Sequence, residues 1–316
     1  MVDFRYHLIS LIAVILALAL GILAGSGFLG GPILDQLKGE VTGFKDRTRE
    51  LNTLIDEQDA SLNQAEDFAQ GAEPLLIHGQ LAGAEIVLFQ FEGAEGRLVD
   101  GIKNELSEAG AQVISEITLT SKLALGSAPA QDELSLITGS LTGDPDQLLE
   151  DLAVTLGERA AAAAADSGQT EAPTTTASQR FDALVGQLET SEFVGVDATQ
   201  TDRVVPPGAE FIVIGGSPDR PPFAMDQFMP ALMTALGERG APSIVVEETA
   251  STWGLVRAVR TNIEARSRAS TVDNGETTIG RIAVILGLDQ AGEGNIGHFG
   301  VQAGRTAIIP APNPTG

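Results

Sequence analysis

Three methionines have the residue type and the spacing that suggest metal chemistry. Met225, Met229 and Met233 follow one another at intervals of four residues, so a helix would present their thioethers on one face. Thioethers are soft ligands that select Cu(I). Methionine at helical spacing also fills cores, and Pro230 is a poor residue for a helix interior. The pattern leaves a copper site and a core segment open, and it favours the core segment.

A second set of candidate residues follows the apolar runs that we expect to form strands. In an open α/β sheet, ligands bind at the carboxyl ends of the strands. The residues expected at this edge form a rim that could hold a ligand or a partner: Glu92, Gly216, Ser217, Glu248 and Trp253. The tryptophan suits a half-buried core position at least as well as a partner anchor.

The chain lacks the motifs that an enzyme of this class would need. Neither G-x-G-x-x-G nor G-x-x-x-x-G-K-[ST] occurs, so no nucleotide cofactor is expected. Ser217, His298 and Asp289 are the one triad that can be assembled, and no G-x-S-x-G turn surrounds the serine. We expect a turn serine in "GGSPDRPP" and a loop histidine in "GNIGHFG". The sequence therefore predicts a protein that is not an enzyme.

The charge balance argues against one class of partner. The chain has 19 basic and 43 acidic residues, a net charge of -24, which would repel a phosphate backbone. It has no cysteine, which removes disulfides, thiol catalysis and cysteine metal sites. Nucleic acid is not an expected partner.

Strand-like and helix-like segments alternate over residues 72–310. Short apolar runs separated by helical stretches predict an α/β domain with a doubly wound, mainly parallel sheet of Rossmann or flavodoxin type. The expected strands are 85–91, 111–119, 210–216, 243–248 and 282–288. The later expected helices are 144–165, 180–188, 227–239 and 253–260. A Thr/Ala/Pro stretch at about 163–178 predicts a flexible linker inside the domain, and residues 311–316 form a tail.

Residues 1–33 have the composition of a membrane anchor. Residues 8–34 carry no charge, which exceeds the roughly 20 residues that cross a bilayer as a helix. A signal-peptide core is shorter, about 7 to 15 residues, so an uncleaved anchor is favoured over a cleaved signal. Arg5 before the span and Lys38, Lys45, Arg47 and Arg49 after it leave the orientation unsettled by charge. Because large domains translocate with little regard to local charge, we expect a single span in the cytoplasmic membrane and an extracytoplasmic domain.

Residues 34–71 carry a heptad pattern that predicts a coiled coil and hence a homodimer. The expected contact positions in the span and the rod are Ala13, Ala17, Gly21, Gly25, Leu34, Leu37, Val41, Phe44, Leu51, Ile55 and Leu62. Thr48 and Gln58 are polar breaks in this seam. The small residues of the span, ending in a G-x-x-x-G, would let two helices approach closely in lipid. Glycines and a proline in residues 27–32 predict a helix break between span and rod.

The opening "MVDFRYHLISLIAVILALALGILAG", followed by the heptads, resembles the actinobacterial MctB family. Three other stretches fit as well, "LAGAEIVLFQFEGA", "LSEAGAQV" and "STVDNGETTIGRIAVILGL" with "GNIGHFG" after it. The resemblance implies a cell-envelope protein of bacteria with a mycolic-acid outer layer. It implies copper efflux or resistance or, in SteB-type members, control of cell separation by activation of a peptidoglycan hydrolase.

The residues help to choose between these roles. A conduit needs several spans or a closed barrel, and three methionines are a thin supply of copper ligands. A tethered rod that carries a noncatalytic domain suits a regulator or scaffold. Our leading hypothesis is therefore a dimeric envelope protein that activates a peptidoglycan hydrolase, and the alternative is a component of copper transport or resistance.

Overall fold

The structure is a computed structural model that describes residues 4–166, 176–198 and 203–311. The side chains of residue 4 and of residues 26–35 lie outside the description. The chain divides into two compact units, Met1–Ala65 and Glu66–Gly316, which are taken separately below. We call the first unit from residue 36 onward the rod, and the second unit the domain.

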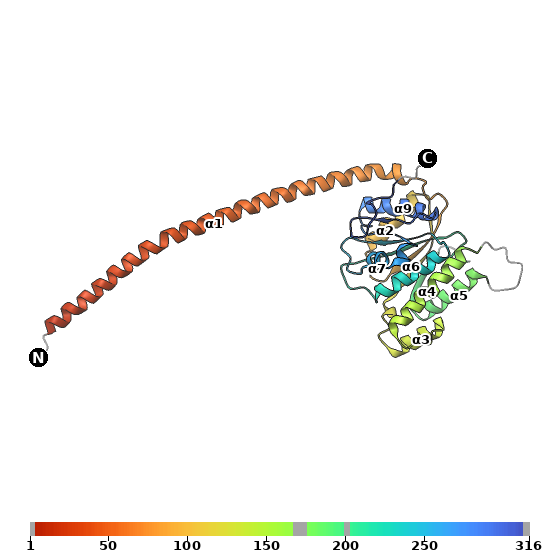
Figure 1. Ribbon diagram of the computed structural model, residues 1–316, viewed down its shortest axis with the longest axis horizontal. Coiled ribbons are helices and arrows are strands. Elements are labelled where there is room, and N and C mark those ends of the chain that lie inside the picture. Colours follow the sequence, from red (N-terminus) through yellow and green to blue (C-terminus); the bar gives the residue numbers. More distant parts are fainter. Residues whose placement is uncertain (1–3, 167–175, 199–202, 312–316) are drawn as a thin grey trace. The chain divides into compact units, whose positions relative to one another are not determined.

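The first unit is a single long helix. α1 runs from Phe4 to Ile77 and ends within the second unit. Arg5–Gly25, the first part of the long helix in Figure 1, is long and apolar enough to cross a membrane, judged by length and composition. Its side chains are exposed. The break predicted in residues 27–32 is wrong, because the backbone stays helical there. Helix growth is cooperative, so strong helix formers on both sides can carry a helix through a weak stretch.

The second unit is built on one mixed sheet of seven strands in the order β3-β2-β1-β4-β5-β6-β7. Among the strand pairs that the described residues form, only β2 and β3 run antiparallel. The bounds are β1 Glu85–Phe91, β2 Gln112–Leu119, β3 Val194–Ala198, β4 Glu210–Gly215, β5 Ser243–Glu247, β6 Ser270–Val272 and β7 His298–Phe299. The mainly parallel, doubly wound sheet predicted from the sequence is confirmed, and its order reverses between β1 and β4.

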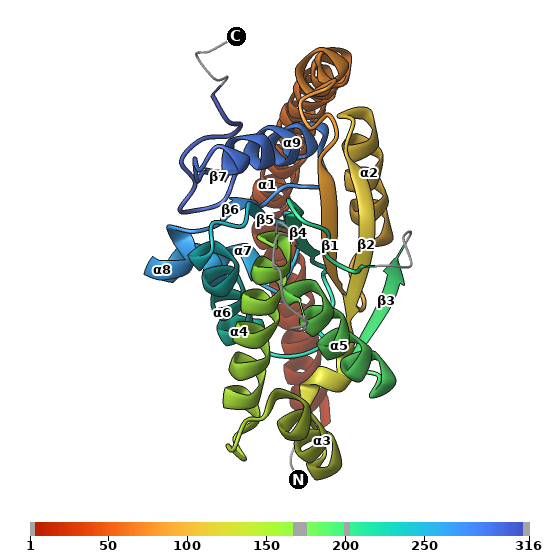
Figure 2. The ribbon, with the colours of Figure 1, turned by 90° about the vertical axis from the view of Figure 1, so that its right-hand side faces the viewer.

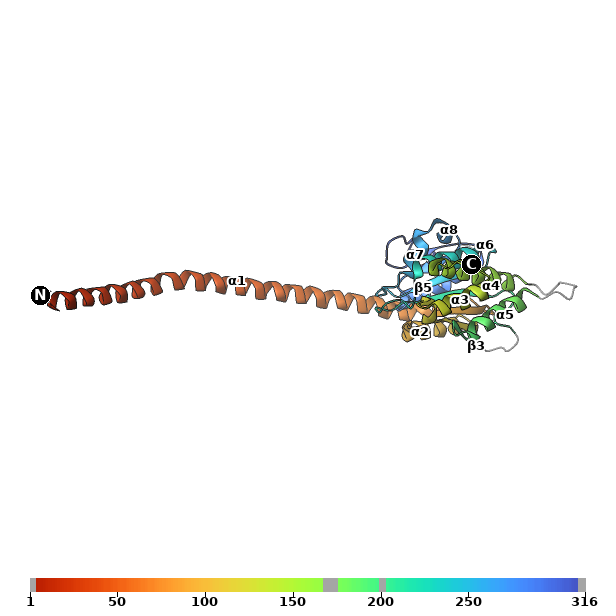
Figure 3. The ribbon, with the colours of Figure 1, turned by 90° about the horizontal axis from the view of Figure 1, so that it is seen from below.

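Helices cover both faces of this sheet (Figures 1 and 2). Their bounds are α2 Gly96–Glu108, α3 Ala128–Thr138, α4 Pro145–Ala164, α5 Ala177–Thr190, α6 Met225–Glu238, α7 Leu255–Thr261, α8 Ile263–Arg266 and α9 Thr278–Gly292, with a 3-10 turn η1 at Ser121–Ala124. β1 shows the division, because Phe89 packs with α3 to α7 while Leu88 packs with α2 and α9. The long helices α4, α5 and α6 gather on one side of the sheet (Figure 3).

The prediction of a strand at residues 282–288 is wrong. "IAVILGL" lies inside α9, whose first turn is capped by the Thr277 side chain accepting from the Gly280 N–H. A short run made up only of apolar residues fits a buried strand and a buried helix equally well, because it shows no period. The sheet is completed instead by the very short β6 and β7, which carry too few residues to show a period.

The linker expected at about 163–178 overlaps the gap between the described segments. α4 ends at Ala164 and α5 begins at Ala177 with a capping box between Thr176 and Gln179. Residues 167–175 lie outside the described residues, and so do residues 312–316 of the expected tail.

Candidate functional site

The rim residue Glu92 lies directly after β1. Its Oε2 accepts a hydrogen bond from the Ser121 N–H at 2.5 Å, and this bond lowers the pKa of the carboxyl. The Glu92 N–H donates to the Leu119 carbonyl at the end of β2. Glu92 therefore fastens the start of η1 to the first strand.

Gly216 and Ser217 form a tight turn after β4. Gly216 has a φ of +129°, and a Cβ there would lie 3.2 Å from the Glu248 backbone nitrogen, so only glycine fits without strain. The buried Ser217 Oγ accepts from the Asp219 N–H at 3.2 Å. The serine thus has the turn role that its sequence context suggests.

The triad of Ser217, His298 and Asp289 is not assembled. The charge of Asp289 helps to raise the pKa of Glu210, the first residue of β4. Ser217 follows the opposite end of the same strand, so Asp289 and Ser217 do not meet. His298 lies in β7, where its Nδ1 is 3.0 Å from Thr271 Oγ1 and its Nε2 is 3.1 Å from the Arg266 carbonyl oxygen. Burial, with Arg260 and Arg266 nearby, lowers the pKa of His298 to about 4. This histidine is neutral at physiological pH and already has partners for both ring nitrogens.

Two neighbouring glutamates after β5 have different roles. Glu247 is 2% exposed, and its carboxylate accepts from the N–H groups of Gly254 at 2.7 Å and Val256 at 3.0 Å, at the start of α7. Glu248 Oε1 is buried and has no hydrogen-bond partner among the described residues. Burial raises the pKa of Glu248, and Glu95, Glu276 and Glu247 add to that shift. Glu247 therefore holds the start of α7 in place, whereas Glu248 has a buried carboxyl oxygen that no described residue hydrogen-bonds.

Trp253 fills the centre of the rim. It is 5% exposed, its Nε1–H donates to the Asp219 carbonyl at 2.9 Å, and its ring meets Phe91 edge to face with centroids 6.2 Å apart. Phe223 and Phe228 pack against the same Phe91 ring. The five predicted rim residues therefore do lie at one edge of the sheet, and four aromatic rings fill the point where the strand order reverses.

All three candidate methionines lie on α6 and point into the core. Met225 is 3% exposed, and Met229 and Met233 are fully buried in the cluster between the sheet and α4 to α7. α6 continues through Pro230, which lies inside the helix and has no N–H to donate to the Asp226 carbonyl. The thioethers share one face, as the spacing predicts, and that face is inaccessible to solvent. Within the described residues, no three His, Asp or Glu side chains group closely enough to hold a metal ion.

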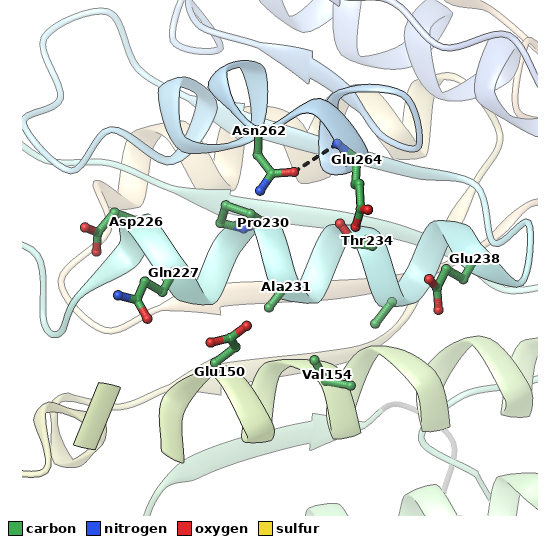
Figure 4. Close-up of a pocket in the computed structure, with 11 residues that line it drawn as sticks. Glu150, Val154, Asp226, Gln227, Pro230, Ala231, Thr234, Glu238, Asn262 and Glu264 are labelled. Carbon is green, nitrogen blue, oxygen red and sulfur yellow. Dashed lines mark hydrogen bonds between the residues drawn. The ribbon is translucent and has the colours of Figure 1, made fainter. Parts of the chain in front are cut away.

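A hollow that the sequence reasoning missed lies on the opposite face of α6. It has a volume of about 450 Å³ and runs between α4, α6 and the start of α8 (Figure 4). Its lining includes four acidic residues, Glu150, Asp226, Glu238 and Glu264, together with Pro230 and Val154. The spacing of Asp226, Pro230, Thr234 and Glu238 at four-residue intervals could have revealed this face.

A second missed feature is a polar clamp that holds the last turns of α1 to α2 and α9. Arg281 Nε donates to Glu105 Oε1 at 2.8 Å, and its Nη2 lies 4.0 Å from Glu73 Oε1. Thr278 Oγ1 donates to Glu66 Oε1 at 2.5 Å. Burial raises the pKa of Glu73 to about 7, and the adjacent Glu105 adds to the shift. One arginine thus holds two neighbouring carboxyls from different helices, Glu73 of α1 and Glu105 of α2.

Comparison with known proteins places the whole chain in one family. A family model described as "Copper transport outer membrane protein, MctB" matches residues 1–310. The curated relatives include the copper transporter MctB of Mycobacterium bovis and of Mycobacterium tuberculosis H37Rv, each 27% identical over 98% of this chain and 99% of the relative. The copper transporter MctB of Mycobacterium leprae is 26% identical over the same shares of the two chains. With this match from end to end, the chain belongs to the MctB family.

Proposed function

We propose that this protein is a membrane-anchored, noncatalytic component of copper transport or copper resistance in the cell envelope. The observation that carries the proposal is the match to proteins named copper transporters over 99% of their length. Since the anchor, the rod and the domain are all included in that match, the proposal concerns the whole chain and not one segment.

The anchor supports a place in the membrane. Arg5–Gly25 has 21 residues, which at about 1.5 Å per residue reach across the roughly 30 Å hydrocarbon core. We place this helix as a single span in the cytoplasmic membrane, with the domain outside the cytoplasm.

The same helix limits what one copy can do. A path for ions needs several helices or a closed barrel to shield it from lipid, and one helix encloses nothing. The chain would therefore act on copper through a path that partners or further copies provide. Its well-packed domain suits a holding or gating role.

The methionine face of α6 is the candidate copper ligand set within the chain. Met225, Met229 and Met233 are the methionines other than Met1, and the chain has no cysteine. Because all three are buried, Cu(I) would reach them only when α6 moves away from the core. Replacing the three with leucine keeps the volume nearly constant, so folding should survive while soft-metal binding is lost.

The test is a deletion of the gene in its own host, followed by growth and cell-associated copper measured over a copper series. The proposal expects poorer growth at high copper and a higher copper content, both restored by the wild-type gene. The triple leucine variant serves as the second arm, and full restoration by it would exclude the methionines as ligands. Unchanged growth and unchanged copper in the deletion strain would contradict the proposal.

A second candidate function is activation of a peptidoglycan hydrolase during cell separation. The exposed seam of the rod and the absence of an assembled triad favour it, because an activator needs a binding surface and no chemistry of its own. The same deletion strain tests it by microscopy, where chained cells with normal copper content would support this function over copper handling. Purified protein should then also raise hydrolase activity on cell walls.

A further inference from the structure

The rod carries an apolar seam that its own chain leaves uncovered. Leu37, Val41, Phe44, Leu51 and Ile55 recur at alternating intervals of four and three residues once Thr48 is counted between Phe44 and Leu51. These five apolar side chains are all exposed, with Phe44 73% exposed. Exposed apolar area of this extent marks an interaction surface. We propose that the seam pairs two copies of this chain in a parallel, in-register, two-stranded coiled coil, and this pairing stands apart from the copper proposal.

The side-chain shapes along the seam favour two strands. With Leu37 and Leu51 at d positions of the heptad, three consecutive a positions are Val41, Thr48 and Ile55, all β-branched, and the next one is Leu62. β-Branched residues at a with leucine at d favour a parallel dimer over larger bundles. Thr48 Oγ1 donates to the Phe44 carbonyl of its own helix at 2.8 Å, so its hydroxyl enters the seam already paired.

The charges beside the seam permit the parallel register. Glu40 stands at g and Lys45 at the e position of the next heptad, which face each other across two parallel helices in register. An antiparallel pair would instead bring Lys45 near Asp59 and Lys38 near Glu66. The anchor decides between the two arrangements, because copies that start in one membrane must leave it in the same direction.

The domain sets the far end of the paired stretch. The next a position after Leu62 is Ala69, which is buried within the domain, and Glu66 is bonded to Thr278. Neither residue is free to join a second helix. The pairing therefore ends near Ala65, earlier than the limit of residue 71 expected from the heptads.

The absence of cysteine makes a direct test available, since any introduced cysteine is alone in the chain. Val41→Cys and Ile55→Cys place a thiol at two a positions, where parallel helices in register lie within disulfide reach. Thr53→Cys is the matched control on the outer face of the same helix. The full-length variants are oxidised mildly in membranes, and the products are separated on denaturing gels without a reducing agent.

Parallel pairing predicts a covalent dimer for both a-position variants and at least tenfold less for the Thr53 control. Equal cross-linking of all three variants, or none at positions 41 and 55, would overturn the proposal. Mixing Phe44→Cys with Leu62→Cys chains tests the antiparallel arrangement, because a d position faces an a position there, and a product formed only in that mixture would also overturn the proposal. A charge reversal at Lys45→Glu should lower the dimer yield about twofold, with recovery in Glu40→Lys/Lys45→Glu.

Discussion

The rod and the domain use the same kinds of residue in opposite ways. Leu51 and Ile55 of the rod are exposed, whereas Leu152 and Ile285 of the domain are fully buried. The domain even buries charge internally, with Arg260 Nη1 and Asp273 Oδ2 2.5 Å apart at 3% and 0% side-chain exposure. The domain thus buries its apolar residues within one chain, whereas the rod leaves its apolar seam exposed for the pairing that we propose.

The largest expected effect on the domain comes from removing Asp273. Its carboxylate pairs with Arg260 and also accepts from the N–H groups of Val301 and Gln302. Asp273→Ala leaves a buried arginine unpaired, which should lower the free energy of unfolding by about 3–5 kcal/mol. Chemical denaturation of the full chain measures this, while cross-linking through Val41→Cys should persist because the rod is separate.

Replacing both Arg260 and Asp273 tests whether the unpaired charge causes the loss of stability. Arg260→Met with Asp273→Leu removes both charges and should recover part of the lost stability. A loss below about 1 kcal/mol for Asp273→Ala alone would mean that the domain does not depend on this pair.

The next effect is a steric one between α4 and α6. A Cβ at Gly157 would lie 2.6 Å from the Ala235 Cβ and 2.8 Å from the Leu232 carbonyl oxygen. Gly157→Ala should therefore cost about 1–3 kcal/mol through overpacking, measured by thermal unfolding. Gly186→Ala in α5 is the control, since nothing lies within 4 Å of its Cβ, and it should be neutral or stabilising. Equal melting temperatures for the two variants would contradict the close crossing of α4 and α6.

A smaller effect concerns pH at the clamp. The pKa of Glu73 is raised to about 7, so the folded domain holds a proton there that the unfolded chain loses near pH 4.5. This group therefore makes stability fall as pH rises from about 4.5 to 7. Glu73→Gln should weaken that fall in unfolding experiments at pH 5 and pH 8. Glu105 and Glu108 help to raise the pKa of Glu73, and Arg281 opposes them.

Two other buried groups help to interpret the pH series. Glu210, with a pKa raised to about 7 by burial, adds a fall of the same sign. His298, whose pKa is lowered from 6.5 to about 4, acts in the opposite direction, because it destabilises the domain as pH falls from about 6.5 to 4. Identical pH dependence in wild type and Glu73→Gln would show that the clamp does not hold a proton.

The smallest expected effect on the domain comes from the seam. Leu51→Asn with Ile55→Asn should abolish pairing yet change the domain's free energy of unfolding by less than about 0.5 kcal/mol. Leu136→Asn changes a still more exposed leucine on the domain, 85% against 59% for Leu51, and as the control it should leave pairing intact. A large drop in domain stability in the seam variant would break the division between rod and domain.

Sequence patterns predicted the elements that are long or strongly periodic. The heptads of the rod, the apolar run before Gly25, and the strands β1, β4 and β5 are all visible as period or composition. α9 was mistaken for a strand because an all-apolar run has no polar face to reveal its period. β3, β6 and β7 are too short or too mixed to stand out.

The contacts of the site could be predicted less well, because they join residues distant in sequence. Arg281 meets Glu105 across 176 positions and helps to hold Glu73 on α1, a grouping that no local spacing signals. The methionine face of α6 was visible in the sequence, but its burial depends on which strands and helices pack against it. The aromatic rings at the rim likewise come together only through the sheet order.

The mass of the full-length protein in a mild detergent tests the central claim most directly. The account predicts two copies for the wild type and for Leu136→Asn, and one copy for Leu51→Asn/Ile55→Asn with an unchanged domain melting transition. A single copy for the wild type, or two copies that survive the seam changes, would contradict it.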